Sequence, residues 1–348
     1  MTTDTATPPA SGLALVQRPR RVRGLWLLVA ASVLLVLMIA SVMVGSRDVG
    51  WSAVVGAFSG AVDGFDQAAV AKRIPRTILA VLAGAALGVS GAVMQGVTRN
   101  PLADPGILGI NLGASLAVVA GLAYFGLAAA STTIWIAIIG AAVTAVFVYT
   151  IGSLGRGGAT PLKLALAGAA TSAALASFIT AVVLPRGDIA SSVRSWQIGG
   201  VGGGTFVLIN QVLPFLIAGL LICLLSARGL NSLALGDDLA AGLGERVAVA
   251  RGAAALGSVI LCGAATAVTG PIGFVGLVVP HACRLVVGVD HRWLLPFSAI
   301  VGAVLLTSAD ILGRVVARPA EIDVGIITAL IGAPIFIAIV RRQKVSAL

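Results

Sequence analysis

Charged residues are scarce in this sequence. They make up 10% of the 348 residues, whereas 58% are hydrophobic and the mean hydropathy is +1.07. About a quarter of the residues in a soluble globular chain are charged, and a chain this apolar cannot cover a surface that faces water. The scarcity of charge therefore excludes a water-soluble protein and predicts one that crosses a membrane many times.

The chain also lacks the motifs on which common enzyme sites depend. It has no P-loop pattern G-x-x-x-x-G-K-[ST], no HExxH and no GxSxG, and its two histidines, His281 and His291, are ten residues apart. The three cysteines, Cys223, Cys262 and Cys283, lie in apolar runs without CxxC spacing, which predicts packed thiols. We therefore expect a non-enzymatic chain with no catalytic residues, no metal ligands and no cofactor of its own.

Acidic residues are nearly absent from the apolar runs. Ion-coupled transport normally needs an ionisable residue deep in the bilayer, and Asp310 comes closest to that position. It lies four residues before Arg314, a spacing that places the two side chains on one helix face. The pattern favours a local ion pair over a proton relay.

Apolar runs bounded by glycine, proline and charged residues predict an all-α polytopic membrane protein with about ten transmembrane helices. The predicted spans are 25–45, 76–96, 105–125, 132–153, 162–184, 207–227, 249–268, 274–288, 293–313 and 324–340. The first run lacks a small-residue cleavage site, so it is predicted to be retained. The transmembrane domain is expected at 25–340, with a disordered N-terminal tail at 1–24 and a C-terminal tail at 341–348.

The 23 Lys and Arg residues give a formal net charge of +10 and are spread along short loops. This distribution suits membrane topology and anionic lipid, and no dense basic run with aromatics indicates nucleic acid. The clusters RPRRVRG before the first span and RRQK after the last predict that both termini are cytoplasmic. Eight basic residues then remain outside: Arg47, Lys72, Arg73, Arg76, Arg186, Arg194, Arg314 and Arg318.

Two similar stretches suggest an internal duplication. DPGILGINLG (104–113) opens the third predicted span, and TGPIGFVGLVVP (269–280) opens the eighth. A half with five spans that is repeated once must insert in the opposite orientation, because five is odd. The sequence therefore predicts inverted five-helix repeats, a recurrent arrangement in transporters.

Three predicted cytoplasmic loops have features beyond a simple connection. The loop at 226–251 contains a predicted short helix at 235–244, with acidic residues in its first turn and glycines at its ends. Such a helix can dock in a groove of a soluble partner, although an ordinary connecting loop fits as well. The loops 98–106 and 155–163 contain proline and glycine and suit either a narrow constriction or plain interhelical turns.

The segment RIPRTILAVLAGAALGVSGAVMQGVTRNPLADPGILGINLGAS (73–115) resembles the signature of FecCD/BtuC-type permeases, the membrane subunits of ABC importers for iron-siderophores and cobalamin. Other matching stretches are GATPLKLALAG (158–168), LNSLALGDDLAAGLG (230–244), TGPIGFVGLVVPHACR (269–284) and PAEIDVGIITALIGAP (319–334). The resemblance runs from about residue 70 to the C-terminus. Asp323 departs from it, because the family usually has proline after Glu-Ile.

The resemblance implies a BtuC-like type II importer permease in the bacterial cytoplasmic membrane. The implied partners are a second permease subunit, identical or paralogous, two ABC ATPase subunits that use ATP and Mg, and a substrate-binding protein. The segment MQGVTRNPLADPG resembles siderophore permeases more than cobalamin permeases and so favours a ferric siderophore as substrate. Cobalamin and haem are the alternatives in the same family. An ion-coupled secondary transporter with inverted repeats is the alternative from another class.

Three sets of functional residues follow from the resemblance. Docking of the binding protein is expected at Arg73, Arg76, Arg314 and Arg318. Coupling to the ATPase is expected in the loop near 228–250, at Gly236, Asp237, Asp238, Ala241, Leu243 and Gly244. An inner gate is expected at Asn100 and Leu102, with Thr160 and Pro161 near a second constriction.

Overall fold

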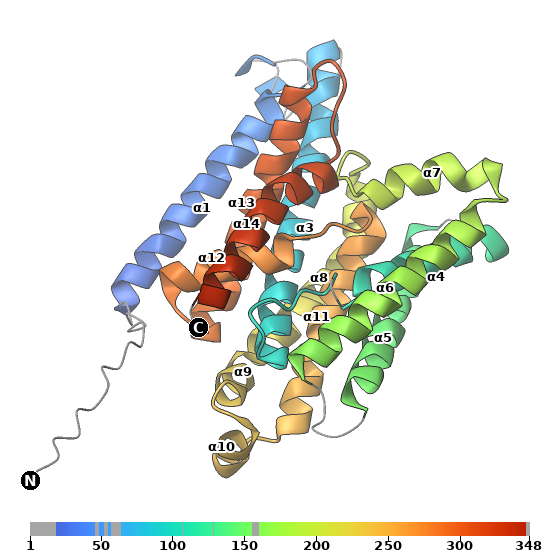
Figure 1. Cartoon of the computed structure of the whole chain (residues 1–348). Helices are drawn as coiled ribbons and strands as arrows, with labels where there is room; N and C mark the ends of the chain where they lie inside the picture. Colours follow the sequence, from blue (N-terminus) through green and yellow to red (C-terminus); the bar gives the residue numbers. More distant parts are fainter. Residues whose placement is uncertain are drawn as a thin grey trace, which may run out of the picture.

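The structure is a computed structural model that describes residues 19–45, 49–51, 55–56, 64–106, 108–127, 129–154 and 160–345. Every regular secondary-structure element within these ranges is an α-helix (Figure 1). The long helices are α1 (Arg20–Met43), α3 (Phe65–Thr98), α4 (Ile110–Phe125), α5 (Ala130–Ser153), α6 (Pro161–Val183), α8 (Phe206–Leu225), α11 (Val247–Thr269), α12 (Val275–Val287), α13 (His291–Val316) and α14 (Val324–Val345). The shorter helices are α7 (Gly187–Ile198), α9 (Ala227–Leu233) and α10 (Asp237–Gly242).

Each predicted span overlaps one of the long helices. Of the described helices, seven are long and apolar enough to cross a membrane: α1, α3, α5, α6, α8, α11 and α13. The helices α4 and α12 and the apolar part of α14 (Val324–Ile339) are shorter. The predicted all-α polytopic fold is therefore confirmed, whereas a count of ten membrane crossings stays a prediction.

The helix ends differ from the predicted boundaries. α1 begins at Arg20, so residues 20–24, expected in the N-terminal tail, are helical, and α14 runs to Val345 into the expected C-terminal tail. Hydropathy marks the apolar stretch only, whereas long basic side chains let a helix continue beyond it into the headgroup region. α7 has no counterpart among the predicted spans because its sequence, GDIASSVRSWQI, is short and polar. Residues 1–18 and Arg47 lie outside the described ranges.

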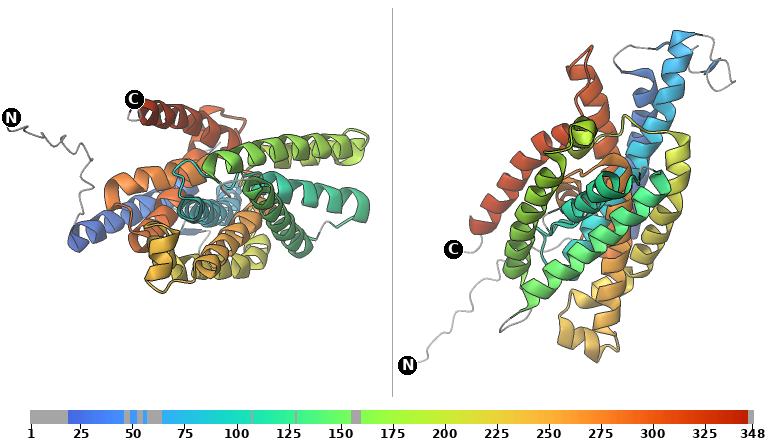
Figure 2. Two further views of the ribbon diagram at one scale, coloured as in Figure 1. Left: turned by 60° about the horizontal axis from the view of Figure 1, so that its bottom comes forward. Right: turned by 90° about the vertical axis from the view of Figure 1, so that its right-hand side faces the viewer.

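α3 lies at the centre of the helix bundle and is the most buried of the seven long apolar helices. Its glycines allow neighbouring backbones to approach closely. A Cβ atom added at Gly91 would lie 2.0 Å from the backbone oxygen of Gly276, and one at Gly302 would lie 2.2 Å from that of Gly84. Close packing of this kind holds helices together in lipid, where apolar contact gives no preference for protein over lipid. By contrast, α1 lies at the periphery in the left view of Figure 2, and Ser41 is its one buried residue.

The predicted duplication has a structural counterpart. In both places a long buried helix, α3 or α11, is followed by a non-helical loop and a shorter apolar helix, α4 or α12. Each shorter helix starts after a residue in the left-handed region, Gly109 with φ 75° and Phe274 with φ 68°. The two similar stretches of sequence therefore occupy equivalent places.

The two ends of the bundle carry different elements. In the orientation of Figure 1, α1 begins and α14 ends at the lower end, where α9 and α10 also lie. The start of α3 and the end of α13 lie at the upper end. We call these the lower end and the upper end of the bundle.

Candidate functional site

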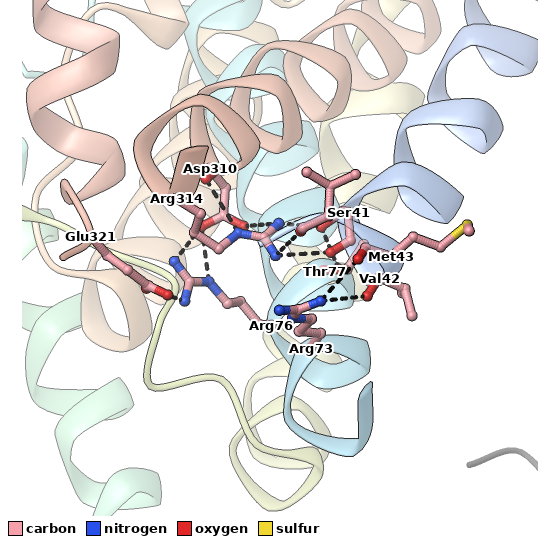
Figure 3. A network of polar contacts seen from close by, with 10 residues as sticks. Ser41, Val42, Met43, Arg73, Arg76, Thr77, Asp310, Arg314 and Glu321 are labelled. Atoms are coloured by element: carbon pink, nitrogen blue, oxygen red, sulfur yellow. Dashed lines mark hydrogen bonds and ion pairs between the residues drawn. The ribbon is translucent and has the colours of Figure 1, made fainter. Parts of the chain in front are cut away.

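Arg314 of α13 is buried at the upper end, with 1% of its surface exposed (Figure 3). Its Nη2 atom lies 2.8 Å from Oδ2 of Asp310, which confirms the ion pair predicted from the four-residue spacing. Its Nη1 atom donates to the backbone oxygens of Ser41 at 2.8 Å and Val44 at 3.0 Å. The side chain therefore joins α13 to the end of α1.

Arg76 of α3 shares the same carboxylate. Its Nε atom donates to Oδ1 of Asp310 at 2.9 Å, and its Nη1 atom donates to Oε2 of Glu321 at 2.6 Å. The side chain of Asp310 is fully buried, whereas that of Glu321 is 39% exposed. Asp310 thus pairs with two guanidinium groups that extend from different helices, and Glu321 supplies a second carboxylate.

Arg73, a residue of α3, forms hydrogen bonds with the C-terminal end of α1. Its Nη1 atom donates to the backbone oxygens of Val42 and Met43, both at 3.1 Å. The last carbonyl groups of a helix have no partner within the helix, and α1 has no basic residue in its own last turn. Arg73 and Arg314 therefore cap α1 from outside it. We call the set Ser41, Arg73, Arg76, Asp310, Arg314 and Glu321 the upper polar network.

The four predicted docking residues differ in accessibility. Arg73 and Arg314 are buried, with 8% and 1% of their surfaces exposed, and both hold intramolecular partners. The side chain of Arg76 is 14% exposed, and Arg318 is exposed. Docking at these residues stays a prediction, and for Arg73 and Arg314 it requires the exchange of bonds that hold helices together.

A short helix, α10, lies at the lower end beside α9. The predicted coupling residues all lie in it or next to it: Gly236, Asp237, Asp238, Ala241, Leu243 and Gly244. Gly236 has φ 113°, a conformation that favours glycine. Ala240 packs inward, while Leu239 and Leu243 are 63% and 70% exposed on successive turns. The helix therefore presents an apolar face that nothing within the described residues covers.

Asp237 ties α10 to two long helices. Its Oδ1 atom accepts a hydrogen bond from Nη2 of Arg251 in α11 at 2.8 Å and another from Nη2 of Arg99. Arg99 ends α3 with φ 51° and directly precedes Asn100. The carboxylate thus connects the exposed helix to the residue before the predicted gate loop.

The predicted gate residues Asn100 and Leu102 line a cavity of about 370 Å³, whereas Thr160 and Pro161 are not among its lining residues. Asn100 and Leu102 contribute from the loop after α3, and Leu162 and Leu164 from the first turn of α6. The Oδ1 atom of Asn100 accepts a hydrogen bond from the backbone N–H of Leu102 at 3.0 Å, which holds the loop in a tight turn. Thr160 caps α6 by accepting from the backbone N–H of Lys163 at 3.4 Å, and Pro161 is the first helical residue. The cavity therefore brings the loop after α3 next to the first turn of α6, while the inner gate and the second constriction stay predictions.

Several partners in these sites have no signal in the sequence. Arg76 and Glu321 are separated by 245 residues, and no local pattern relates them. Phe336 of α14 lines the gate cavity although it belongs to an ordinary apolar run. The loop 226–251 contains Arg228, Arg246 and Arg251, and its sequence alone does not single out Arg251 as the partner of Asp237.

Neither a metal site nor a disulfide is found among the described residues. No group of three or more His, Cys, Asp and Glu is placed to hold a metal ion in that part of the chain. The three cysteines are free and buried, as predicted from the apolar runs around them.

Comparisons with known proteins agree with this arrangement. Residues 33–342 match the model of the FecCD transport family. The chain is 44% identical to the ferric enterobactin transport system permease protein FepD of Escherichia coli (strain K12), over 96% of this chain and 98% of that protein. It is 42% identical to the probable siderophore transport system permease protein YfiZ of Bacillus subtilis (strain 168), over 89% of this chain and 93% of that protein.

A solved structure described as an inward-facing conformation of a putative metal-chelate type ABC transporter has the same fold. It superposes with a TM-score of 0.77 at 26% identity and covers 92% of this chain and 99% of that one. The family match spans most of the chain, and the apolar helices mark a multi-pass membrane protein. The chain therefore belongs to the FecCD transport family, as the resemblance in its sequence predicted.

Proposed function

We propose that this chain is the permease subunit of a bacterial ABC importer that moves a ferric siderophore across the cytoplasmic membrane. A second permease subunit, two ATPase subunits that use ATP and Mg, and a substrate-binding protein complete the importer. The substrate assignment rests on the likeness to siderophore permeases over nearly the whole chain. Haem and cobalamin are the alternative substrates.

The link between α10 and the gate cavity is the observation that carries the mechanism. The exposed leucines of α10 suit a groove on an ATPase subunit. Movement of that subunit would be transmitted from α10 to Arg99 through the bond with Asp237. Arg99 directly precedes the loop that contains Asn100 and Leu102, so this loop would move as well. ATP binding and hydrolysis in the partner would thereby open and close the inner gate, while this chain performs no covalent chemistry.

This mechanism fixes an orientation. The lower end, with α10, the start of α1 and the end of α14, faces the cytoplasm, and the upper end faces the binding protein. Basic clusters near residues 20–23 and at Arg341 then lie inside, in line with the positive-inside tendency.

Reconstitution in liposomes with the partner subunits tests the proposed function. Uptake of ⁵⁵Fe-loaded siderophore should require ATP, the ATPase and the binding protein, and should persist when an ionophore dissipates ion gradients. Uptake that continues without the ATPase and stops with the ionophore would establish the ion-coupled alternative. Equal or better uptake of haem or cobalamin would overturn the siderophore assignment.

Docking of the binding protein is proposed at the exposed Arg318 and at the accessible part of the upper polar network, Arg76 with Glu321. Arg318→Glu should lower capture of the binding protein about two- to fivefold at low ionic strength, because exposed charges contribute modestly and are screened by salt. Glu321→Gln should raise capture, since it frees Nη1 of Arg76 from an intramolecular carboxylate. Capture is measured on transporter held in nanodiscs, at low and high salt.

The two variants change the charge in opposite directions on the same surface. A docking site there requires opposite effects on capture that both shrink at high salt. Unchanged capture in both variants at low ionic strength would place the docking surface elsewhere.

A further inference from the structure

A basic pocket lies between the lower ends of α1 and α13. It is a cavity of about 400 Å³ lined by Arg20, Arg23, Leu27, Asp290, Arg292, Trp293 and Pro296. The two helices run side by side in the same direction, because Ser41 and Arg314 meet at their far ends. Both helices therefore begin at this pocket.

The charge in the pocket is unbalanced. Three guanidinium groups face a single carboxylate, Asp290. That carboxylate already accepts hydrogen bonds from Nδ2 of Asn231 at 2.7 Å and from the backbone N–H of Arg292 at 3.0 Å. Burial raises the pKa of Asp290, but these hydrogen bonds and the nearby arginines hold the pKa below its ordinary value. Asp290 is thus ionised, and its Oδ1 atom already binds Asn231 of α9 and the start of α13.

Arg23 is left with unsatisfied hydrogen-bonding capacity. Its side chain is only 12% exposed, and its Nη1 atom lies 3.9 Å from Oδ2 of Asp290, too far for a hydrogen bond. Its Nε atom is buried without a hydrogen-bond partner among the described residues. A buried donor of this kind normally meets an acceptor, because leaving it unpaired is unfavourable.

The first turn of α1 strengthens the attraction for an anion. It holds Arg20, Arg21 and Arg23, it has no acidic residue, and Pro19 provides no side-chain cap. Cations at the positive end of a helix are unfavourably placed, and a bound anion relieves that arrangement.

The rest of the pocket is apolar and continues into the lipid-facing surface. Leu27, Trp293 and Pro296 line it beyond the arginines. The neighbouring Leu25 and Leu28 of α1 are 61% and 64% exposed. A tryptophan next to basic residues at helix ends is typical of the level of lipid headgroups.

We propose that this pocket binds the phosphate group of an anionic phospholipid, with its acyl chains along the exposed face of α1. The three arginines supply charge-assisted donors, and the apolar residues account for a lipid in preference to a free anion. This inference stands independently of the transported substrate.

The test uses the full chain in nanodiscs of phosphatidylcholine with and without phosphatidylglycerol. Native mass spectrometry counts retained lipid, and thermal unfolding gives the apparent affinity from the rise in Tm with phosphatidylglycerol content. Arg23→Gln should weaken this affinity about five- to tenfold, and Arg23→Lys should lose less than half of that effect. Arg21→Gln is the matched control: it removes an exposed charge from the same turn, outside the pocket lining, and should change the affinity less than twofold.

Unfolding in pure phosphatidylcholine separates loss of the site from loss of the fold, since Arg23→Gln should keep the wild-type Tm there to within a few degrees. If the Tm of Arg23→Gln falls sharply in pure phosphatidylcholine, the lipid affinities of Arg23→Lys and Arg21→Gln are compared instead. Equal losses of affinity for phosphatidylglycerol at positions 21 and 23 would mean that the lipid responds to surface charge in general and not to a pocket. That result would overturn the proposal. Stabilisation by millimolar inorganic phosphate in pure phosphatidylcholine that matches phosphatidylglycerol would also overturn it, in favour of a free anion.

Discussion

Replacement of Asp310 by Ala is expected to destabilise the protein by about 3–5 kcal/mol, because it leaves buried positive charge without its counter-ion. Arg314 is almost fully buried and has Asp310 as its ion-pair partner, and Arg76 also bonds to the same carboxylate. Thermal unfolding in detergent can be followed with a thiol-reactive dye, since all three cysteines are buried and free.

Two further variants make this expectation specific. Glu321→Ala removes the other carboxylate of the upper polar network, but that side chain is 39% exposed, so a loss of at most about 1 kcal/mol is expected. The double variant Asp310→Leu with Arg314→Met removes both members of a buried pair and should recover part of the stability lost by Asp310→Ala. If Asp310→Ala and Glu321→Ala unfold at the same temperature, the buried carboxylate has no special role.

Replacement of Asp237 by Asn is expected to lower ATP-driven uptake about tenfold, a change of about 1.4 kcal/mol in the coupled step. The substitution keeps the shape of the side chain but weakens its bonds to Arg99 and Arg251, the links from α10 to α3 and α11. Those bonds are partly exposed and contribute little to stability, so Tm should change by only a few degrees. Uptake and ATP hydrolysis are measured together on the reconstituted importer, and hydrolysis should continue.

The neighbouring acid provides the control. Asp238 is also exposed and lies in the same first turn of α10, yet no bond from it to α3 or α11 is found among the described residues. Although Asp238 is also a predicted coupling residue, Asp238→Asn breaks no such bond and should lower uptake much less than Asp237→Asn. Equal uptake in the Asp237→Asn and Asp238→Asn variants would remove Asp237 from the coupling path.

The long helices could be predicted from sequence because a membrane span needs only length and an apolar surface. The predicted spans 132–153 and 249–268 differ from α5 and α11 by two residues at most at either end. α7 could not be found in this way, because a short helix outside the apolar runs leaves no hydropathy signal. Hydropathy also says nothing of which helices meet, since that depends on glycines such as Gly91 facing Gly276.

The candidate sites could be predicted in position but not in their bonding. The bond between Asp310 and Arg314 follows from helical spacing, whereas Arg76 and Asp310 are 234 residues apart and meet only through the packing of α3 on α13. From the sequence, Arg73 and Arg314 resemble surface residues because each lies beside an apolar run, yet both are buried in the fold. The basic pocket was missed for the same reason, because the start of α1 and the start of α13 become neighbours only in the folded bundle.

The attachment of α1 has a consequence for biosynthesis. This helix buries a single residue and is held at its upper end mainly by Arg73 and Arg314. It is synthesised well before Arg314, which follows Ser41 by 273 residues. Until then the upper end of α1 is held by Arg73 of α3 but lacks its bonds to α13. A nascent chain interrupted before residue 314 would thus leave α1 loosely attached, where a membrane protease that removes incomplete proteins can reach it.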